Sequence, residues 1–550
     1  MKLLLSLGLL ISSCSIVTSS SGQYAAETLQ SFRQPKNIAF VVFAGGSSHT
    51  EWVLSILEEL SHRGHTTTYL TRDSQVKFGK KFPSIETVSL GNDTKHGVGF
   101  KALSADNRQR TLPVLTWKLL KVMESTFEED YQKTLEFFKS KSVDVAICDH
   151  FTASCQEACH TLQIPFLVTS SIADAPDTEA PYIDNDQLYT RALTNLDVSF
   201  FERFHDKLIL PIKVYFSTYT LIQELRSRFL ALGIKDPVFP YQERWKDSIK
   251  LFNTAFGFES ARSLGPLVEL IGPIIPKSTE SKLTQALEHF LASHQRVAYI
   301  AFGQHATTNE AELTVLLAGL LEAYETGAID GMIWSTRGLD GIIPPVIVTS
   351  SNTTYDIHQL LNQDKPNNFA FLQWAPQTAI LQHPSTILFV THAGAGSLYE
   401  GLQAGKRLVF YPFFGDQPRN TQLAEKFGLG LAVDYKGSRT NAAQVIQRVA
   451  RDEDGFFQSN VNRFQALVQI KSQSGVIHGA NLVEEVAFMH QNTILHHRRD
   501  IKHDLSFIVA HNLDVYAFGL ISLCLPLFVG IFALTSLANR DDDRTKAKIQ

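Results

Sequence analysis

Residues 374–417 read WAPQTAILQHPSTILFVTHAGAGSLYEGLQAGKRLVFYPFFGDQ. The centre of this stretch, ILFVT at 387–391, is a continuous run of apolar and β-branched residues, which is typical of a strand buried on both faces. The run ends in the glycine-containing segment 392–396, and a helix pattern begins at Ser397, with Glu400 at the spacing of a capping box. A glycine-rich turn between a strand and a helix presents free backbone N–H groups, and the helix dipole favours an anion there. The stretch therefore predicts a loop able to hold a diphosphate without a metal, although an ordinary strand–loop–helix corner with a hydrogen-bonded histidine fits the same residues.

The order of several separated residues in this stretch resembles the donor-binding signature of the UDP-glycosyltransferase family. That signature begins with Trp-x-Pro-Gln, continues through His-x-Gly and a Glu, and closes with Asp-Gln. The matching residues are Trp374, Pro376, Gln377, His392, Gly394, Glu400, Asp416 and Gln417. Matches at separated positions, in order, are far more specific than one glycine-rich loop, and on them the chain is identified as a member of this family.

Length and charge narrow the class of protein. At 550 residues the chain exceeds one ordinary domain, which predicts two domains with attachments. The formal net charge is −5 and the pI is about 6.4. Because the sequence also lacks a basic stripe, its composition argues against nucleic acid as a partner.

The two ends of the chain carry targeting patterns. Residues 1–22 read as a signal peptide, with a positive start, a short apolar run and small residues at a cleavage zone. Residues 514–538 contain about 24 consecutive uncharged, mostly apolar residues, enough for a transmembrane helix. The basic tail 539–550 predicts a cytosolic C-terminus and a luminal position for the rest; its run Asp541–Asp543 is interpreted as solvated tail rather than a metal cluster. The final residues, KAKIQ, are similar to the Lys-x-Lys-x-x signal for return to the endoplasmic reticulum.

Residues 23–272 are predicted to form the first of two doubly wound, Rossmann-like α/β domains. Residues 37–43, a helix and a further strand make a βαβ unit, which implies a parallel sheet. His49 follows the first strand and Asp149 follows a strand at 143–148, so both lie where open α/β sheets place their ligands. Taken alone, His49 also fits a helix cap and Asp149 an N-cap.

The resemblance implies a role for His49 and Asp149, and it also implies how the rest of the chain is divided into domains. It implies that His49 activates the acceptor and that Asp149 is its partner. It also implies the glycosyltransferase-B fold, in which a linker, here 273–281, joins the acceptor-binding domain to a UDP-sugar-binding domain, here 282–503. In the same family the stretch equivalent to 186–232 lies near the acceptor pocket and the membrane face, although core packing explains its apolar pattern equally well.

The resemblance further implies which residues bind the donor. The implied roles are uracil stacking for Trp374, contact with the base edge or ribose for Gln377, diphosphate binding for His392, Gly394 and Ser397, ribose binding for Glu400, and binding of sugar hydroxyls for Asp416 and Gln417. No metal and no cofactor is expected beside the UDP-sugar co-substrate, because fixed dipoles stabilise the leaving group. Three features depart from the family pattern. Gln304 replaces a common serine near the diphosphate, Gly396 takes a variable position and is assigned no sugar contact, and residues 338–368 are predicted to be a surface insertion.

Cysteines and sequons add two smaller predictions. Cys148, Cys155 and Cys159 are expected to be buried free thiols. Three cysteines clustered in the chain cannot cross-link a large domain by disulfides, and a zinc site needs a fourth ligand. Asn92 and Asn352 each begin a glycosylation sequon, so a glycoprotein is expected.

The predicted function is inverting, metal-independent transfer of a hexose from a UDP-sugar to a hydroxyl of a lipophilic small molecule, sterol or lipid. Gln417 favours glucose, and glucuronic acid is the alternative sugar. Two other hypotheses stand: transfer to membrane lipid or protein acceptors, and an inactive luminal regulator that only binds UDP-sugar. The presence of both His49 and Asp149 argues against the regulator. The expected location is the endoplasmic reticulum membrane, with one span and luminal catalytic domains, and a homo-oligomer is compatible with the sequence.

Overall fold

A computed structural model of the chain describes residues 32–92, 112–186, 192–276, 282–303, 308–339, 341–362 and 367–547. The side chains of residues 112, 115, 503 and 538–547 are not described. The predicted signal peptide, Gln304, the Asp541–Asp543 side chains and the last three residues therefore lie outside what is described. The chain divides into two units, Met1–Leu495 and His496–Gln550, which are considered one at a time.

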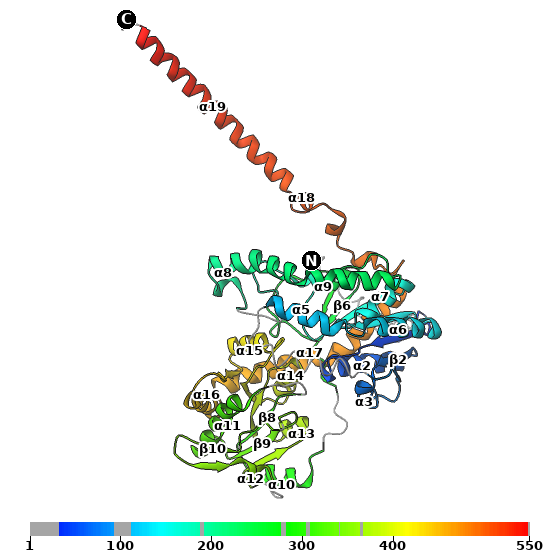
Figure 1. The fold of residues 1–550 in the computed structure, drawn as a ribbon, viewed down its shortest axis with the longest axis vertical. Coiled ribbons are helices and arrows are strands. Elements are labelled where there is room, and N and C mark those ends of the chain that lie inside the picture. The colour runs from blue at the N-terminus through cyan, green and yellow to red at the C-terminus, as the bar shows by residue number, and fades with distance from the viewer. Residues whose placement is uncertain are drawn as a thin grey trace, which may run out of the picture. The chain divides into compact units, whose positions relative to one another are not determined.

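The first sheet of the larger unit has seven strands in the order β3-β2-β1-β4-β5-β6-β7, with parallel pairing throughout. Figure 1 shows the course of the chain through this unit. Its strands are β1 (Asn37–Val41), β2 (Thr66–Thr71), β3 (Glu86–Ser89), β4 (Val145–Asp149), β5 (Phe166–Ser170), β6 (Lys250–Phe252) and β7 (Val268–Leu270). Chain order reverses between β1 and β4, so the loops that follow these two strands diverge and leave a crevice at the carboxyl edge. Both strands are buried, as their apolar sequences predict.

Helices cover both faces of this sheet and bury two apolar clusters against it. They are α2 (Ser47–His62), α3 (Val76–Gly79), α5 (Leu112–Met123), α6 (Phe127–Lys141), α7 (Ala153–Leu162) and α9 (Leu210–Ala231). Before α9 the chain forms α8 (Phe200–Phe204) and a π-helical turn, η4 (His205–Ile209), neither of which has a buried residue. On α2 the residues Trp52, Val53, Ile56, Leu57 and Leu60 are buried. Their helical spacing puts them on one face of α2, which packs on the sheet.

The second sheet has six parallel strands in the order β12-β9-β8-β13-β14-β15. Its strands are β8 (Val297–Ala301), β9 (Gly331–Ser335), β12 (Phe369–Leu372), β13 (Thr386–Thr391), β14 (Arg407–Phe410) and β15 (Gly430–Ala432). The helices beside it are α10 (Gln285–Ser293), α11 (Glu310–Glu325), α13 (Gln377–Gln382), α14 (Ala395–Gln403), α15 (Gln417–Lys426) and α16 (Arg439–Arg451). Two doubly wound domains are therefore confirmed.

The segment 338–368 contains a small antiparallel pair, β10 (Val346–Val348) with β11 (Thr354–Asp356), followed by α12 (Ile357–Leu361). Ile347 and Ile357 are buried in the core of the second domain. The described part of this segment therefore packs on the domain through one apolar side, while Asn352 is exposed at the turn of the hairpin.

Helix α14 begins earlier than predicted. Its first residue is Ala395 and its N-cap is Gly394, with no side-chain cap hydrogen bond. Ser397 and Glu400 thus lie inside the helix, and the predicted capping box is wrong. The physical reason is that Gly394, still in the extended conformation, acts as the N-cap, so that the helix begins at Ala395 and leaves Ser397 and Glu400 for other contacts.

Helix α17 (Phe456–Met489) connects the two domains. Val461 and Val468 pack in a cluster of the second domain, whereas Ala480, Val483 and Val486 pack with α2 and the first sheet. Buried polar contacts hold the end of α17 in place: the carboxylate of Glu484 accepts hydrogen bonds from Arg33 (2.7 Å) and Arg63 (2.6 Å) and lies 3.2 Å from the His65 ring. The last helix of the second domain is therefore part of the core of the first.

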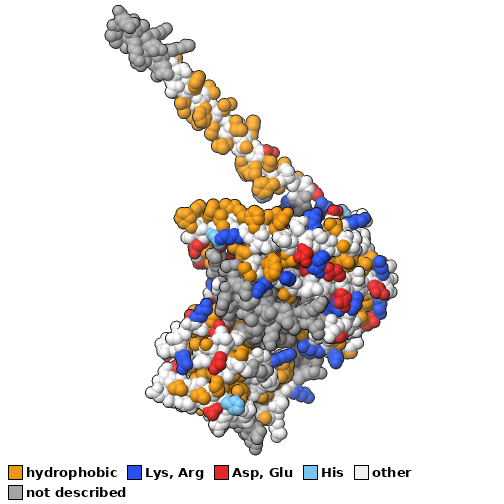
Figure 2. Space-filling view, viewed as in Figure 1, with side chains coloured by type: hydrophobic (Ala, Val, Ile, Leu, Met, Phe, Trp, Pro, Cys, Tyr) orange, Lys and Arg blue, Asp and Glu red, His pale blue; other side chains and the backbone are white. Residues whose placement is uncertain are grey.

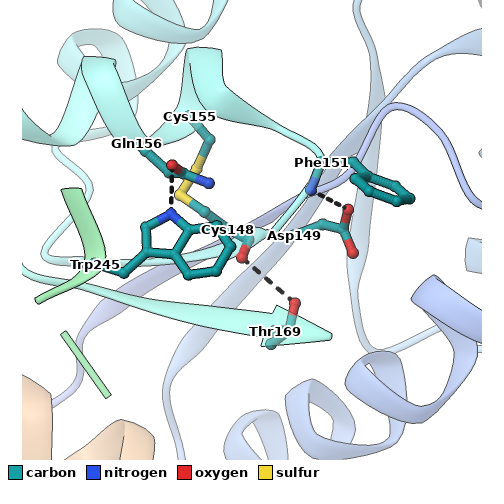
Figure 3. The surroundings of a disulfide bond; sticks show 7 residues. All are labelled: Cys148, Asp149, Phe151, Cys155, Gln156, Thr169 and Trp245. Carbon is teal, nitrogen blue, oxygen red and sulfur yellow. Dashed lines mark hydrogen bonds between the residues drawn. A yellow bond between two sulfur atoms is a disulfide. The ribbon is translucent and has the colours of Figure 1, made fainter. Parts of the chain in front are cut away.

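A disulfide joins Cys148, the residue before Asp149, to Cys155 in α7 (Figure 3). The prediction of free thiols is wrong for this pair and holds for Cys159, which is buried and unpaired. The turn from β4 into α7 brings the two Cα atoms to 5.8 Å from each other, although the residues are seven positions apart in the chain. The bond links neighbouring elements rather than distant ones, which the prediction had not considered.

Two surfaces are apolar. On the larger unit, the helical segment from α8 through α9 exposes apolar side chains in a continuous band (Figure 2). The exposed residues are Phe200, Phe201, Phe204, Leu208, Ile212, Tyr215, Phe216, Tyr219 and Leu230. In the smaller unit, α19 (Leu513–Ala547) contains a stretch, Leu513–Leu537, that is long and apolar enough to cross a membrane.

Candidate active site

The loop after β1 directs His49 into the crevice. Gly45 and Gly46 both have positive φ, 98° and 71°, and α2 begins one residue later, which places His49 in its first turn. A Cβ atom at Gly45 would lie only 2.3 Å from the His49 ring. Position 45 therefore requires glycine for two reasons: its backbone has a positive φ, and the His49 ring occupies the space that a Cβ atom would need.

His49 and Asp149 form a hydrogen-bonded pair. The Nδ1 of His49 lies 2.9 Å from Oδ2 of Asp149, and the carboxylate is fully buried. Its second oxygen accepts the backbone N–H of Phe151 at 3.0 Å. Burial favours the neutral imidazole, but the adjacent Asp149 carboxylate outweighs burial and raises the pKa of His49. Burial also opposes the charge on Asp149, yet the two neighbouring histidines hold the pKa of that carboxyl well below its usual range.

The sequence reasoning missed a second histidine in this cluster. The Nδ1 of His150 lies 3.6 Å from the same Asp149 oxygen and 3.3 Å from the carbonyl oxygen of Thr169. Its ring is stacked on that of His49, with centroids 5.2 Å apart. Its position immediately after Asp149 was the signal that could have found it. The ligand atoms of His49, Asp149 and His150 lie within 4.8 Å of one another, but both histidines turn Nδ1 towards one carboxylate oxygen, which suits hydrogen bonds to that oxygen.

Three residues of the donor signature contact one another on the second domain. The side-chain amide of Gln377 donates to the Glu400 carboxylate at 2.5 Å and to Ser397 Oγ at 3.4 Å, while Gln377 Oε1 accepts from Tyr299 at 3.4 Å. Burial raises the pKa of Glu400. Trp374 stands apart with 66% of its surface exposed, and the Arg337 guanidinium lies over its ring, 5.5 Å from the centroid.

The loop after β13 carries the predicted diphosphate residues. Ala393 has a positive φ of 64°. A Cβ atom at Gly394 would lie 2.4 Å from Nε2 of His392, so the imidazole packs directly against the loop backbone. Gly396, to which no contact was assigned, is exposed in the first turn of α14.

The end of the signature is anchored by hydrogen bonds. Asn420, which was not predicted, donates to the Asp416 carboxylate at 2.8 Å and to the carbonyl of Ala393 at 2.9 Å. The side-chain oxygen of Gln417 accepts the backbone N–H groups of Phe413 and Phe414 at 2.8 and 3.2 Å. Gln417 therefore shapes the loop with its oxygen, and its amide NH₂ group makes no hydrogen bond to the part of the chain that the structure describes.

One cavity of about 2610 Å³ brings the two sets of residues together. His49 and His150 border it from the first domain, and the donor signature borders it from the second. The His49 and Asp416 side chains are close enough that each shifts the pKa of the other. The predicted acceptor-activating residue and a predicted sugar-binding residue thus border the same cavity from the two domains.

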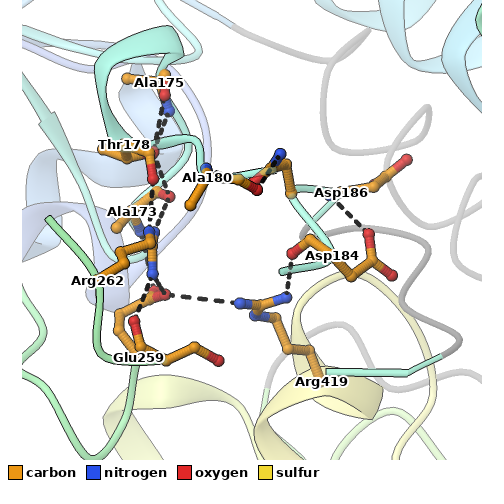
Figure 4. A network of polar contacts seen from close by, with 11 residues as sticks. Ala173, Ala175, Thr178, Ala180, Asp184, Asp186, Glu259, Arg262 and Arg419 are labelled. Atoms are coloured by element: carbon orange, nitrogen blue, oxygen red, sulfur yellow. Dashed lines mark hydrogen bonds and ion pairs between the residues drawn. The ribbon is translucent and has the colours of Figure 1, made fainter. Parts of the chain in front are cut away.

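A buried polar network fixes this approach of the domains (Figure 4). Arg419, in α15, donates to the carbonyl oxygen of Asp184 at 2.8 Å and lies 3.9 Å from Glu259. Glu259 in turn pairs with Arg262 at 3.4 Å. The helix that begins at Gln417 is therefore tied to two segments of the first domain, a link that no local sequence pattern indicated.

Comparisons with known proteins agree with this geometry. The family model described as "UDP-glucoronosyl and UDP-glucosyl transferase" matches residues 39–539. The UDP-glycosyltransferase stmC of Aspergillus ustus is 28% identical over 527 residues, covering 90% of this chain and 96% of that protein. Human UDP-glucuronosyltransferase 2B7 is 22% identical over 520 residues, covering 89% and 91%.

Solved structures show the same fold. A UDP-glucosyltransferase from Polygonum tinctorium, in complex with 3,4-dichloroaniline, superposes with a TM-score of 0.54 at 17% identity, covering 82% of this chain and 99% of that one. This likeness confirms the glycosyltransferase-B architecture that the resemblance implied. With a family model matched over nearly its whole length and the signature residues gathered at one cavity, the chain belongs to the UDP-glucuronosyl and UDP-glucosyl transferase family and is a UDP-glycosyltransferase.

Proposed function

We propose that this UDP-glycosyltransferase transfers glucose from UDP-glucose to a hydroxyl group of a lipophilic small molecule, with inversion and without a metal ion. The observation that carries the proposal is the buried His49–Asp149 pair facing the donor signature across one cavity. A protein that only bound UDP-sugar would need neither this pair nor its approach to Asp416.

In the proposed reaction His49 acts as general base. With Nδ1–H donated to the ionised Asp149, the lone pair of Nε2 is available to take the proton of the acceptor hydroxyl. The oxygen then attacks C1 of the sugar, the bond from C1 to the diphosphate breaks, and UDP leaves with the electron pair. Displacement from the opposite side converts an α-linked donor into a β-linked product. Asp149 stabilises the imidazolium that forms, which is consistent with the raised pKa of His49.

The second domain supplies the donor site in this proposal. The exposed face of Trp374 stacks on uracil, and Gln377 and Glu400, held together at 2.5 Å, bind the base edge and the ribose hydroxyls. His392, Gly394 and Ser397 bind the diphosphate, with the dipole of α14 behind them.

Glucose is preferred over glucuronic acid on electrostatic grounds. Asp416 and Gln417 are the proposed partners of the sugar hydroxyls, and a second carboxylate beside Asp416 would be repelled. The human relative is named a UDP-glucuronosyltransferase, so UDP-glucuronate is retained as the alternative donor.

The membrane arrangement is part of the proposal. The apolar helix Leu513–Leu537 fits a membrane-anchored enzyme. The Cys148–Cys155 disulfide supports an oxidising compartment for the catalytic domains, and the endoplasmic reticulum lumen is such a compartment.

A donor screen with the full-length chain in membranes tests the proposal. UDP-glucose, UDP-glucuronate and UDP-galactose are each offered with a mixed panel of phenols and sterols, with and without EDTA, and products are identified by mass spectrometry. Glucoside formation unaffected by EDTA is expected, with a β-linkage by NMR. Preference for UDP-glucuronate would replace the donor in the proposal, and loss of activity in EDTA that added Mg²⁺ restores would contradict the metal-free mechanism.

A further inference from the structure

His150 lies beside the proposed base and is positioned by the neighbouring strand. Strand β4 ends at Asp149 and pairs with β5, in which Thr169 lies opposite Asp149. The carbonyl oxygen of Thr169 accepts the backbone N–H of His150 at 3.0 Å and its ring Nδ1–H at 3.3 Å. Because a carbonyl oxygen can only accept, the neutral His150 ring carries its hydrogen on Nδ1, and its Nε2 keeps a lone pair.

The rings of His49 and His150 lie side by side at the wall of the cavity. Both residues border it, and 13% of the His49 side chain and 8% of the His150 side chain are accessible. The two ring planes are within 13° of parallel, with centroids 5.2 Å apart. Since both rings direct Nδ1 towards Oδ2 of Asp149, both turn Nε2 away from it. Neither Nε2 has a hydrogen-bond partner among the described residues.

The proposed reaction uses only one of these two lone pairs. Nε2 of His49 takes the proton of the acceptor hydroxyl, while Nε2 of His150 has no part in that step. An imidazole nitrogen with a lone pair binds a group that donates a hydrogen bond. A hydroxyl fulfils this condition, whereas an ether or a carbonyl oxygen does not.

We propose that His150 binds a second hydroxyl of the acceptor, next to the hydroxyl that is glycosylated. This inference rests on the proposed function and narrows its substrate class: the preferred acceptors are apolar molecules that carry two hydroxyls on one edge, as ortho- and meta-dihydroxyphenyl groups do. Nε2 of His49 meets one hydroxyl, and Nε2 of His150 accepts a hydrogen bond from the other.

The test uses hexyl-substituted catechol, resorcinol and hydroquinone, each compared with its monomethyl ether, in which one oxygen cannot donate. Each compound is titrated by calorimetry into the UDP-saturated full-length protein in detergent. Catechol or resorcinol is expected to bind about fivefold more tightly than its ether, the gain that one added hydrogen bond gives. The hydroquinone pair, whose hydroxyls lie on opposite edges of the ring, should show no such difference.

Three variants separate ligand binding by His150 from a structural role. His150→Asn keeps an N–H group near the position of Nδ1, for the Thr169 carbonyl, but ends before the position of Nε2. His150→Gln places a polar group near the position of Nε2 but not near that of Nδ1, and His150→Phe keeps only the ring. The preference for the dihydroxy compound should be lost in the Asn and Phe variants and partly kept in the Gln variant. Intrinsic differences between a compound and its ether cancel in this comparison with the parent.

Several results would overturn the inference. They are equal affinity of the parent for each compound and its ether, a preference that extends equally to hydroquinone, and a preference that the Phe variant keeps. A preference kept by His150→Asn and lost in His150→Gln would show that His150 acts only through Thr169. Glucosyl transfer measured in parallel separates the two proposals: transfer without this preference contradicts only the role of His150, whereas the preference in binding without transfer contradicts only the proposed function.

Discussion

Replacing Asp149 with asparagine is expected to disable the base while leaving the site in place. In the parent, one carboxylate oxygen accepts the backbone N–H of Phe151 at 3.0 Å and the other faces His49 Nδ1 at 2.9 Å. An asparagine has one oxygen. If it stays on the Phe151 N–H, the amide NH₂ group faces Nδ1 and donates to it; the reverse orientation sets two donors against each other, at a cost of about 1–3 kcal/mol. The variant therefore selects the His49 tautomer protonated on Nε2, which cannot accept a proton there.

The size and pH dependence of the loss follow from this geometry. Loss of general-base assistance lowers the rate by about 10²- to 10⁴-fold. In the parent, rate rises with pH as His49 loses its proton, and the raised pKa of His49 places this acid limb above the ordinary value of 6.5. In the variant, burial still favours the neutral imidazole of His49, but the carboxylate that opposed this effect is gone. The pKa of His49 should therefore fall, and the rise of the rate with pH should occur at lower pH.

The assay is initial-rate glucosyl transfer to an aliphatic alcohol and to an acidic phenol, with UDP affinity measured separately by titration. The acidic phenol, already partly ionised at neutral pH, should be harmed least, and UDP affinity should not change. The double variant with His49→Ala should be little worse than His49→Ala alone, because the two residues act as one unit. Near-parental turnover of the aliphatic alcohol by either single variant would refute the mechanism.

Four further outcomes are expected. Gly45→Ala places a Cβ against the His49 ring and should lower turnover at least tenfold with UDP affinity unchanged; equal loss of both would show general misfolding instead. Gln377→Ala and Glu400→Ala should each weaken UDP binding in a direct titration, and unchanged affinity in both would remove them from the donor site. Glu484→Gln should lower the free energy of unfolding by up to about 3 kcal/mol at neutral pH, because the pKa of this buried carboxyl is lowered to about 2. This stabilisation is present above the pKa that Glu484 has in the unfolded chain, and it is lost as the pH falls towards 2. The free energies of unfolding of parent and variant, measured as a function of pH, should therefore converge in acid. A difference that stays constant with pH would contradict this linkage. Truncation before Asn512 should release the protein from membranes in a carbonate wash; if it stays bound, the exposed apolar band on α8 and α9 is a second anchor.

The sequence predicted the strands and the position of the pair well because both depend on local pattern. Apolar β-branched runs placed β1, β4 and β13 to within a few residues. His49 and Asp149 meet because β1 and β4 are neighbours in the sheet, which the pattern of one strand cannot show and the family resemblance supplied.

What the sequence did not reveal depends on contacts between distant segments. The hydrogen bond from Asn420 to the carbonyl of Ala393 and the link from Arg419 to Asp184 join parts of the chain that no periodicity relates. The capping box was wrong because its residue spacing also recurs inside helices, and α14 begins at Ala395 with Gly394 as its N-cap.

Helix α17 has a consequence for how members of this family can recombine. Its first half belongs to the core of the second domain and its second half to that of the first domain. A chimera that exchanges the second domain at the interdomain linker alone would bring a foreign helix end against α2 and would separate Glu484 from Arg63. A functional exchange therefore needs two crossovers, one at the linker and one within α17 between Val468 and Ala480. Each domain core then keeps the half of α17 that packs in it.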